Sequence, residues 1–278
     1  MSISEPKNPT EHARSRSTGI FNIENTLAEC KHQVYFWTFA GEGKQNALSL
    51  HEIRIWKLST GENAAVVKRY VAHGGLDSGC VAVNGAYEKD INLDIVKDLG
   101  TLLTLNGYKV VYTREDDISI HDDGVEGIRN QKISDMENRL EIVKSYPDSV
   151  FISVHQNLYT EPEYFGAQMF YTTNNSGNFR LARIMQGLFA QLQPGNDREV
   201  KLIDNGLYLF KNTEQPALLI ECGFLSNPND AENLSSAEYR KKVAFTIYSG
   251  LEQFFGEEVK NSKEKEVIGE AESFLYMQ

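Results

Sequence analysis

From residue 63 onward, short apolar stretches alternate with longer amphipathic ones, and this alternation limits the possible folds more than any other feature of the sequence. Strand-like runs occur at 64–71, 108–113, 149–154, 166–172 and 217–221. Between and after them, apolar residues recur at helical spacing at 90–106, 129–145, 176–192 and 237–255. Such alternation predicts an α/β fold, with a twisted, mostly parallel sheet flanked by helices on both faces.

Some local patterns lead to narrower predictions. Residues 217–221 are so apolar that this strand is expected in the middle of the sheet. A short strand is predicted at 208–210 and a turn at 226–230, where the sequence reads Ser-Asn-Pro-Asn-Asp. Gly107 is a typical residue to follow the end of a helix.

The regular pattern divides the chain into three parts. Residues 1–62 are predicted to be an extension of unclear role, with strand-like runs at 34–39 and 51–56 but no motif that carries chemistry. Residues 63–256 carry the regular alternation and are predicted to form one domain. Residues 257–278 are rich in Lys and Glu and are predicted to be a charged, solvated tail.

Composition excludes several classes of function. The formal net charge of −11 disfavours binding to a phosphate backbone, so no nucleic-acid partner is expected. Apolar runs are too short to be a transmembrane segment, and the polar start resembles neither a signal peptide nor an anchor. The three cysteines, Cys30, Cys80 and Cys222, are too few for a disulfide framework and are predicted to be free thiols.

Four residues of metal-binding or acid–base type stand near the predicted carboxyl ends of strands. His73 lies in a glycine-rich loop after the first strand, and Glu88 opens the helix that follows. His155 follows the strand at 149–154, and Glu221 ends the strand at 217–221. Because the carboxyl ends of parallel strands meet at one rim, these side chains can converge. Two histidines and a glutamate are typical ligands of a catalytic zinc ion with an open position.

Each of these residues also has a simpler interpretation. His73 could be a polar turn residue, and Glu88 could be a helix N-terminal charge favoured by the macrodipole. His155, at the end of an apolar strand, could equally bond only to backbone. For Glu221 a lone carboxylate at the end of a buried strand requires a reason, which favours a functional role.

Three further polar residues are interpreted differently. Cys222 follows Glu221 directly on a strand and must face the opposite side, so it is excluded as a ligand. Arg114 could meet carboxylates of a substrate or form a structural ion pair. His121, in an acidic loop, is expected to be solvated.

Several motifs between residue 73 and about residue 255 resemble those of the zinc-dependent N-acetylmuramoyl-L-alanine amidases of the Amidase_3 family. They are His-Gly-Gly at 73–75, Glu-Lys-Asp at 88–90, Val-Tyr-Thr-Arg-Glu-Asp-Asp at 111–117, Ser-Val-His-Gln-Asn at 153–157 and Glu-Cys-Gly-Phe-Leu-Ser-Asn at 221–227. Within the family the likeness is greatest to sporulation amidases.

The resemblance implies one zinc ion on His73, Glu88 and His155, with Glu221 as the catalytic glutamate. It implies hydrolysis of the amide between the muramic acid lactyl group and L-alanine, in cell-wall remodelling or spore cortex maturation. The partners would be peptidoglycan glycan strands and stem peptides, with Arg114 and Asn157 as candidate substrate-binding residues. The location implied is the cell wall or spore envelope.

The chain departs from the family just before His73. The family usually has Asp-x-Gly there, whereas this chain has Tyr70, Val71 and Ala72. The change at Tyr70 removes a carboxylate that could orient the histidine, and losses of that kind commonly cost about 10–100-fold in metal affinity or activity. A fusion or frameshift upstream of residue 70 would explain both this departure and the absence of the anchor found in sporulation amidases.

Two alternative functions stay open. A zinc peptidase on the same scaffold would cut between amino acids of the stem peptide. A catalytically impaired wall-binding protein would result if the altered stretch at 70–72 no longer supported metal binding.

Overall fold

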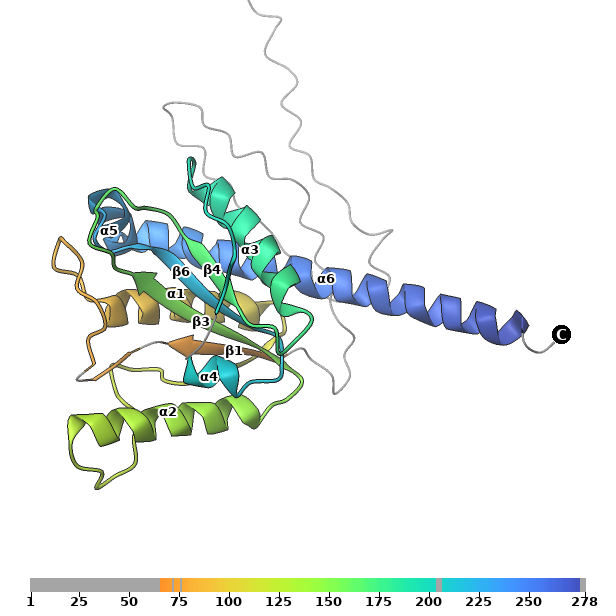
Figure 1. Cartoon of the computed structure of the whole chain (residues 1–278), viewed down its shortest axis with the longest axis horizontal. Coiled ribbons are helices and arrows are strands. Elements are labelled where there is room, and N and C mark those ends of the chain that lie inside the picture. Colours follow the sequence, from red (N-terminus) through yellow and green to blue (C-terminus); the bar gives the residue numbers. More distant parts are fainter. Residues whose placement is uncertain (1–65, 72, 76, 204–206, 276–278) are drawn as a thin grey trace, which may run out of the picture. The chain divides into compact units, whose positions relative to one another are not determined.

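The computed structural model describes residues 66–71, 73–75, 77–203 and 207–275, and for 66–71 and 258–275 it describes the backbone alone (Figure 1). All of them belong to one compact unit. The strands predicted at 34–39 and 51–56 lie outside the described residues, as do Cys30 and Ala72.

A six-stranded mixed sheet forms the centre of the described part, in the order β2-β1-β3-β6-β4-β5. The first four strands in this order are mutually parallel, β4 is antiparallel to β6, and β5 is parallel to β4. The prediction of a mostly parallel sheet with the 217–221 strand in its middle is therefore confirmed. The strands are β1 Val66–Val71, β2 Lys109–Tyr112, β3 Ser149–Asn157, β4 Gln168–Tyr171, β5 Lys201–Leu202 and β6 Ala217–Phe224.

Helices cover both faces of this sheet, as predicted (Figure 1). The larger core lies between one face and helices α1, α3 and α6, while a smaller one lies between the other face and helices α2 and α4. The helices are α1 Glu88–Leu105, α2 Ile128–Lys144, α3 Asn178–Leu192, α4 Tyr208–Lys211, α5 Pro228–Ser235 and α6 Ala237–Leu275.

The alternation of side chains along β3 and β6 decides which face carries the site. Phe151 and Leu219 pack in the smaller core beneath α2 and α4, whereas their neighbours Ile152 and Ile220 pack in the larger core. Successive side chains of a strand point to opposite faces. His155 and Glu221 are therefore on the same face as α2 and α4.

The strand predicted at 208–210 is wrong: these residues form the short helix α4. Leu209 and Phe210 are 3% exposed, and both pack in the smaller core. A three-residue apolar run has no periodicity that separates a strand from a single helical turn, so contacts with α2 and the sheet decided the conformation.

The turn predicted at 226–230 is confirmed only at its start: the chain turns at Ser226 and Asn227, and α5 then begins at Pro228. The side chain of Asn227 accepts hydrogen bonds from the backbone N–H groups of Asn229 and Asp230, which caps the helix. Proline at the first helical position favours this start.

Helix α6 extends beyond its predicted end at residue 255 and continues to Leu275, through most of the predicted tail. Alternating Lys and Glu residues support an exposed helix as well as a solvated coil, so composition did not distinguish the two. None of the helices among the described residues is both long and apolar enough to cross a membrane.

Candidate metal centre

The ends of three adjacent parallel strands and the start of α1 bring the predicted residues together. His73 follows β1 by two residues, and Glu88 is the first residue of α1. β3 extends three residues further than predicted, so His155 lies within it. His155 is paired in register with Glu221 of β6.

Ligand atoms of His73, Glu88 and His155 all lie within 4.8 Å of one another, the one such group among the described residues that could hold a metal ion. Glu88 Oε2 lies 3.3 Å from His73 Nε2, and Glu88 Oε1 lies 3.3 Å from His155 Nδ1. Ligand atoms at zinc-binding distances in a tetrahedral site are about 3.4 Å apart. The three side chains therefore fit a single zinc ion.

Glu88 is held firmly in this position. It is 1% exposed, and its carboxylate accepts hydrogen bonds from the backbone N–H groups of Cys80 and Gln156 at 2.9 and 3.1 Å. The amide of Asn92, one turn later on α1, donates a third at 3.2 Å. Burial alone would raise the pKa of the Glu88 carboxyl, but hydrogen bonds with His155 and His73 outweigh it and hold this pKa well below its usual range.

Asn92 and Gln156 support the site, although neither was among the residues predicted to form it. Gln156 donates to the Asn92 side-chain oxygen at 3.1 Å, and the two residues are 3% and 0% exposed. An asparagine four residues after a candidate ligand, on the apolar face of a helix, is the signal that could have identified this contact.

The loop between β1 and α1 adopts a conformation that few sequences allow. His73 is the one described non-glycine residue with a positive φ, 60°. Gly79 has a φ of 65°, and a Cβ there would lie 2.6 Å from Glu88 Oε2 and 2.7 Å from His73 Cδ2. Only glycine lets the backbone approach both candidate ligands this closely.

A carboxylate contacts His73 from within the same loop. Asp77 Oδ2 lies 3.0 Å from His73 Nδ1, which leaves Nε2 directed at Glu88. Burial lowers the pKa of His73, but the carboxylates of Glu88 and Asp77 outweigh it and raise this pKa above its ordinary value. Tyr70 in place of the usual aspartate predicted the loss of an orienting carboxylate, and no sequence motif pointed to the one at Asp77.

The carboxylate of Glu221 is not fully satisfied by hydrogen bonds among the described residues. Its Oε2 is buried and has no hydrogen-bond partner among the described residues. Burial and the nearby charge of Glu88 raise the pKa of the Glu221 carboxyl to about 8. A bound cation would act in the opposite direction and favour the ionised form.

The remaining predicted residues lie around this centre. Arg114 is 3% exposed and donates to the backbone carbonyl groups of Asp116 and Lys89, which supports its structural interpretation. Asn157 ends β3, two residues beyond His155. Cys222 is a buried free thiol in the larger core, on the opposite face from Glu221 as predicted.

Comparison with known proteins identifies the family. The sequence pattern of the N-acetylmuramoyl-L-alanine amidase family, Amidase_3, matches residues 70–253. The chain belongs to this family of hydrolases. The matched region contains all four residues of the centre.

Named relatives of this amidase support the assignment. The germination-specific N-acetylmuramoyl-L-alanine amidase of Bacillus subtilis is 34% identical over 185 residues, which are 66% of this chain and 77% of that one. The amidase LytC of the same organism is 30% identical over 66% of this chain, and the match spans 34% of LytC.

Solved structures give the same result. The CwlD amidase from Clostridioides difficile, solved in complex with the GerS lipoprotein, has a TM-score of 0.66 and 33% identity. That match covers 69% of this chain and 98% of CwlD. The catalytic domain of CwlV from Bacillus (Paenibacillus) polymyxa has a TM-score of 0.59 and 26% identity, over 69% of this chain and 98% of that one.

Proposed function

We propose that this amidase is zinc-dependent and hydrolyses the amide between the muramic acid lactyl group and L-alanine in peptidoglycan. His73, Glu88 and His155 would hold the zinc ion, and Glu221 would act as general base. The observation that carries the proposal is the convergence of the three ligand atoms within 4.8 Å, beside a carboxylate whose Oε2 is buried and has no hydrogen-bond partner among the described residues.

The candidate ligands and Glu221 would have different roles in the reaction. A zinc ion on three protein ligands lowers the pKa of water to about 7 and polarises a carbonyl group. Glu221 is paired in register with His155, so its carboxylate lies beside the ligands without belonging to the group of three. It can take the proton from the attacking water and return it to the leaving amine of L-alanine.

Digestion of purified peptidoglycan tests the reaction. The expected products are free stem peptides that begin with L-alanine and glycan strands with intact lactyl groups. A zinc peptidase would instead release peptides cut between two amino acids, and a non-catalytic wall-binding protein would release nothing. Mass spectrometry of the soluble fraction separates these three results.

We further propose that Asp77 positions His73. Metal-bound histidines usually donate their second ring N–H to a carboxylate or carbonyl, and Asp77 contacts His73 Nδ1 in this way. Asp77→Ala is expected to lower zinc affinity by about 10–100-fold, as measured by competition with a chelator. Asp77→Asn retains a hydrogen-bond acceptor and should therefore lower zinc affinity less than Asp77→Ala does.

The exposed Asp123, on the loop between β2 and α2, offers a matched control for Asp77. Asp123→Ala should keep wild-type zinc affinity. Equal affinity in the Asp77 and Asp123 variants would contradict the positioning role.

We propose that the catalytic unit lies within residues 63–256 and that residues 1–62 contribute no residue to the site. The family match begins at residue 70, which supports this division. Deleting residues 1–62 is expected to change the rate of peptidoglycan hydrolysis by less than about twofold, because the family match, with all four residues of the centre, begins after them. Loss of activity in a deletion variant that keeps the circular dichroism spectrum of a folded protein would contradict the proposal that residues 1–62 contribute nothing to the site.

The biological setting proposed is the spore envelope or cell wall. The support is the 34% identity with an amidase named as germination-specific, together with the likeness to CwlD. Cortex muropeptides from spores with and without the protein would test this setting, since loss of the amidase should leave stem peptides on muramic acid.

A further inference from the structure

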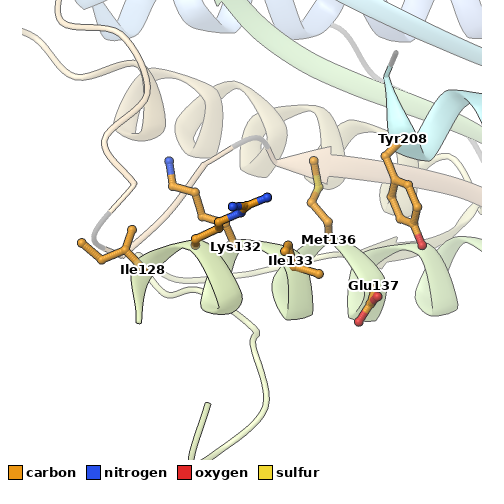
Figure 2. A pocket seen from close by; sticks show the side chains of 7 residues that line it. Ile128, Lys132, Ile133, Met136, Glu137 and Tyr208 are labelled. Carbon is orange, nitrogen blue, oxygen red and sulfur yellow. The ribbon is translucent and has the colours of Figure 1, made fainter. Parts of the chain in front are cut away.

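A groove lies between α2 and α4, on the face of the sheet that carries the candidate metal centre (Figure 2). We call it the α2–α4 groove. It has a volume of about 800 Å³. Figure 2 shows the ring of Tyr208, on α4, facing the helix α2. The lining residues are Ile128, Arg129, Lys132, Ile133, Met136, Glu137 and Tyr208.

A short chain of contacts joins this groove to the metal centre. Lys132 Nζ lies 3.2 Å from Asp77 Oδ1, and Asp77 Oδ2 lies 3.0 Å from His73 Nδ1. His155 and Glu221 project from the sheet on the same face as α2. A substrate positioned at the ligands therefore has the α2–α4 groove beside it.

The surface of the groove combines exposed apolar side chains with cations. Ile128 is 65% exposed, Ile133 49% and Tyr208 42%. Exposed apolar clusters of this kind mark binding surfaces more often than chance positions. Arg129 is exposed, and the side chain of Lys132 is 57% exposed. The ion pair between Lys132 and Asp77 is accessible to solvent, so it contributes little to the stability of the fold. Both cations are therefore accessible to an anionic ligand.

Other cations near the centre are engaged by the protein itself. Arg114 donates to backbone carbonyl groups, and Lys89 contacts Asp117 at 2.6 Å. Arg139 is 1% exposed and binds Asp135. Unlike these three cations, Arg129 and Lys132 are exposed and can contact a substrate anion.

We propose that the α2–α4 groove binds the stem peptide of peptidoglycan, with Arg129 and Lys132 receiving its carboxylates. The residue after L-alanine is a D-glutamate joined through its side chain, so its α-carboxylate is either free or amidated. A glycan strand, rich in hydroxyl groups, matches the two isoleucines and two cations less well. This proposal rests on the proposed amidase function.

The test uses two soluble substrates, each an N-acetylmuramic acid with a short stem peptide. One has the free α-carboxylate on D-glutamate, and the other has it amidated. Arg129→Ala is expected to raise KM for the acidic substrate about tenfold, because a charge-assisted hydrogen bond is lost, and to leave kcat nearly unchanged. For the amidated substrate, KM should differ from that of the wild type by less than about twofold.

Lys144→Ala is the matched control. Lys144 is an exposed cation at the other end of α2, about 22 Å from Arg129 along the helix. It should leave KM for both substrates unchanged, whereas Arg129→Lys should recover part of the loss. Equal KM values for Arg129→Ala and the wild type on the acidic substrate would overturn the proposal, as would the same increase on both substrates.

A binding measurement separates this proposal from the proposed function. Calorimetric titration of the wild-type protein with free stem peptide, acidic or amidated, requires no catalysis. Tighter binding of the acidic peptide that is lost in Arg129→Ala supports the groove even if neither substrate is cleaved. An active enzyme that binds the acidic and amidated peptides equally well would contradict the proposed role of the groove. It would leave the proposed amidase function unaffected.

Discussion

Glu221→Gln is expected to retain zinc and to hydrolyse peptidoglycan about 100- to 10,000-fold more slowly than the wild type. The substitution keeps the size and shape of the side chain but removes the base. Glu221 lies on β6 in register with His155, and its Oε2 has no hydrogen-bond partner among the described residues. We therefore expect that no other described residue of the site depends on the charge of the Glu221 carboxylate in order to fold.

The measurements are kcat on a soluble muropeptide and zinc content by elemental analysis of the same sample. Glu214→Gln, an exposed glutamate before β6, is the control and should match the wild type in both. A Glu221→Gln variant without zinc would make Glu221 a ligand instead. Wild-type turnover would exclude it from the mechanism.

His155→Ala is expected to give a folded protein that contains little zinc. His155 offers one of the three candidate ligand atoms, so its removal should cost more than the roughly 10- to 100-fold in affinity that loss of an outer contact costs. The fold should persist because the side chain is 22% exposed at the rim, outside both apolar cores.

Zinc content and a far-ultraviolet circular dichroism spectrum together measure this result. His121→Ala is the matched control, since His121 contacts Ser119 in the loop before α2 and is absent from the group of three. Full zinc occupancy in the His155 variant would refute the ligand assignment. Loss of zinc from both variants would show that the effect is not specific to His155 and would also contradict the assignment.

The order of strands and helices, and the residues of the site, were accessible from sequence because both depend on local patterns. The apolar run at 217–221 indicated a central strand, and β6 lies between β3 and β4. Parallel strands place their carboxyl ends at one rim. Position along the chain was therefore enough to bring His73, His155 and Glu221 to a common edge.

Short segments and contacts between distant residues were decided by the tertiary structure. Residues 208–210 form a helix because Leu209 and Phe210 both pack in the smaller core, which a three-residue pattern cannot indicate. The hydrogen bonds that hold Glu88 come from Cys80, Asn92 and Gln156, and the last of these is 68 residues away.

The sequence by itself determined the fold class, the family and the candidate ligands, because periodicity and motifs are properties of neighbouring residues. Only the folded chain decided which atoms face one another. Asp77 reaches His73 because the loop turns back at a positive φ, and Lys132 meets Asp77 because α2 crosses the same face of the sheet. Such contacts depend on the path of the backbone in space, which spacing along the chain does not specify.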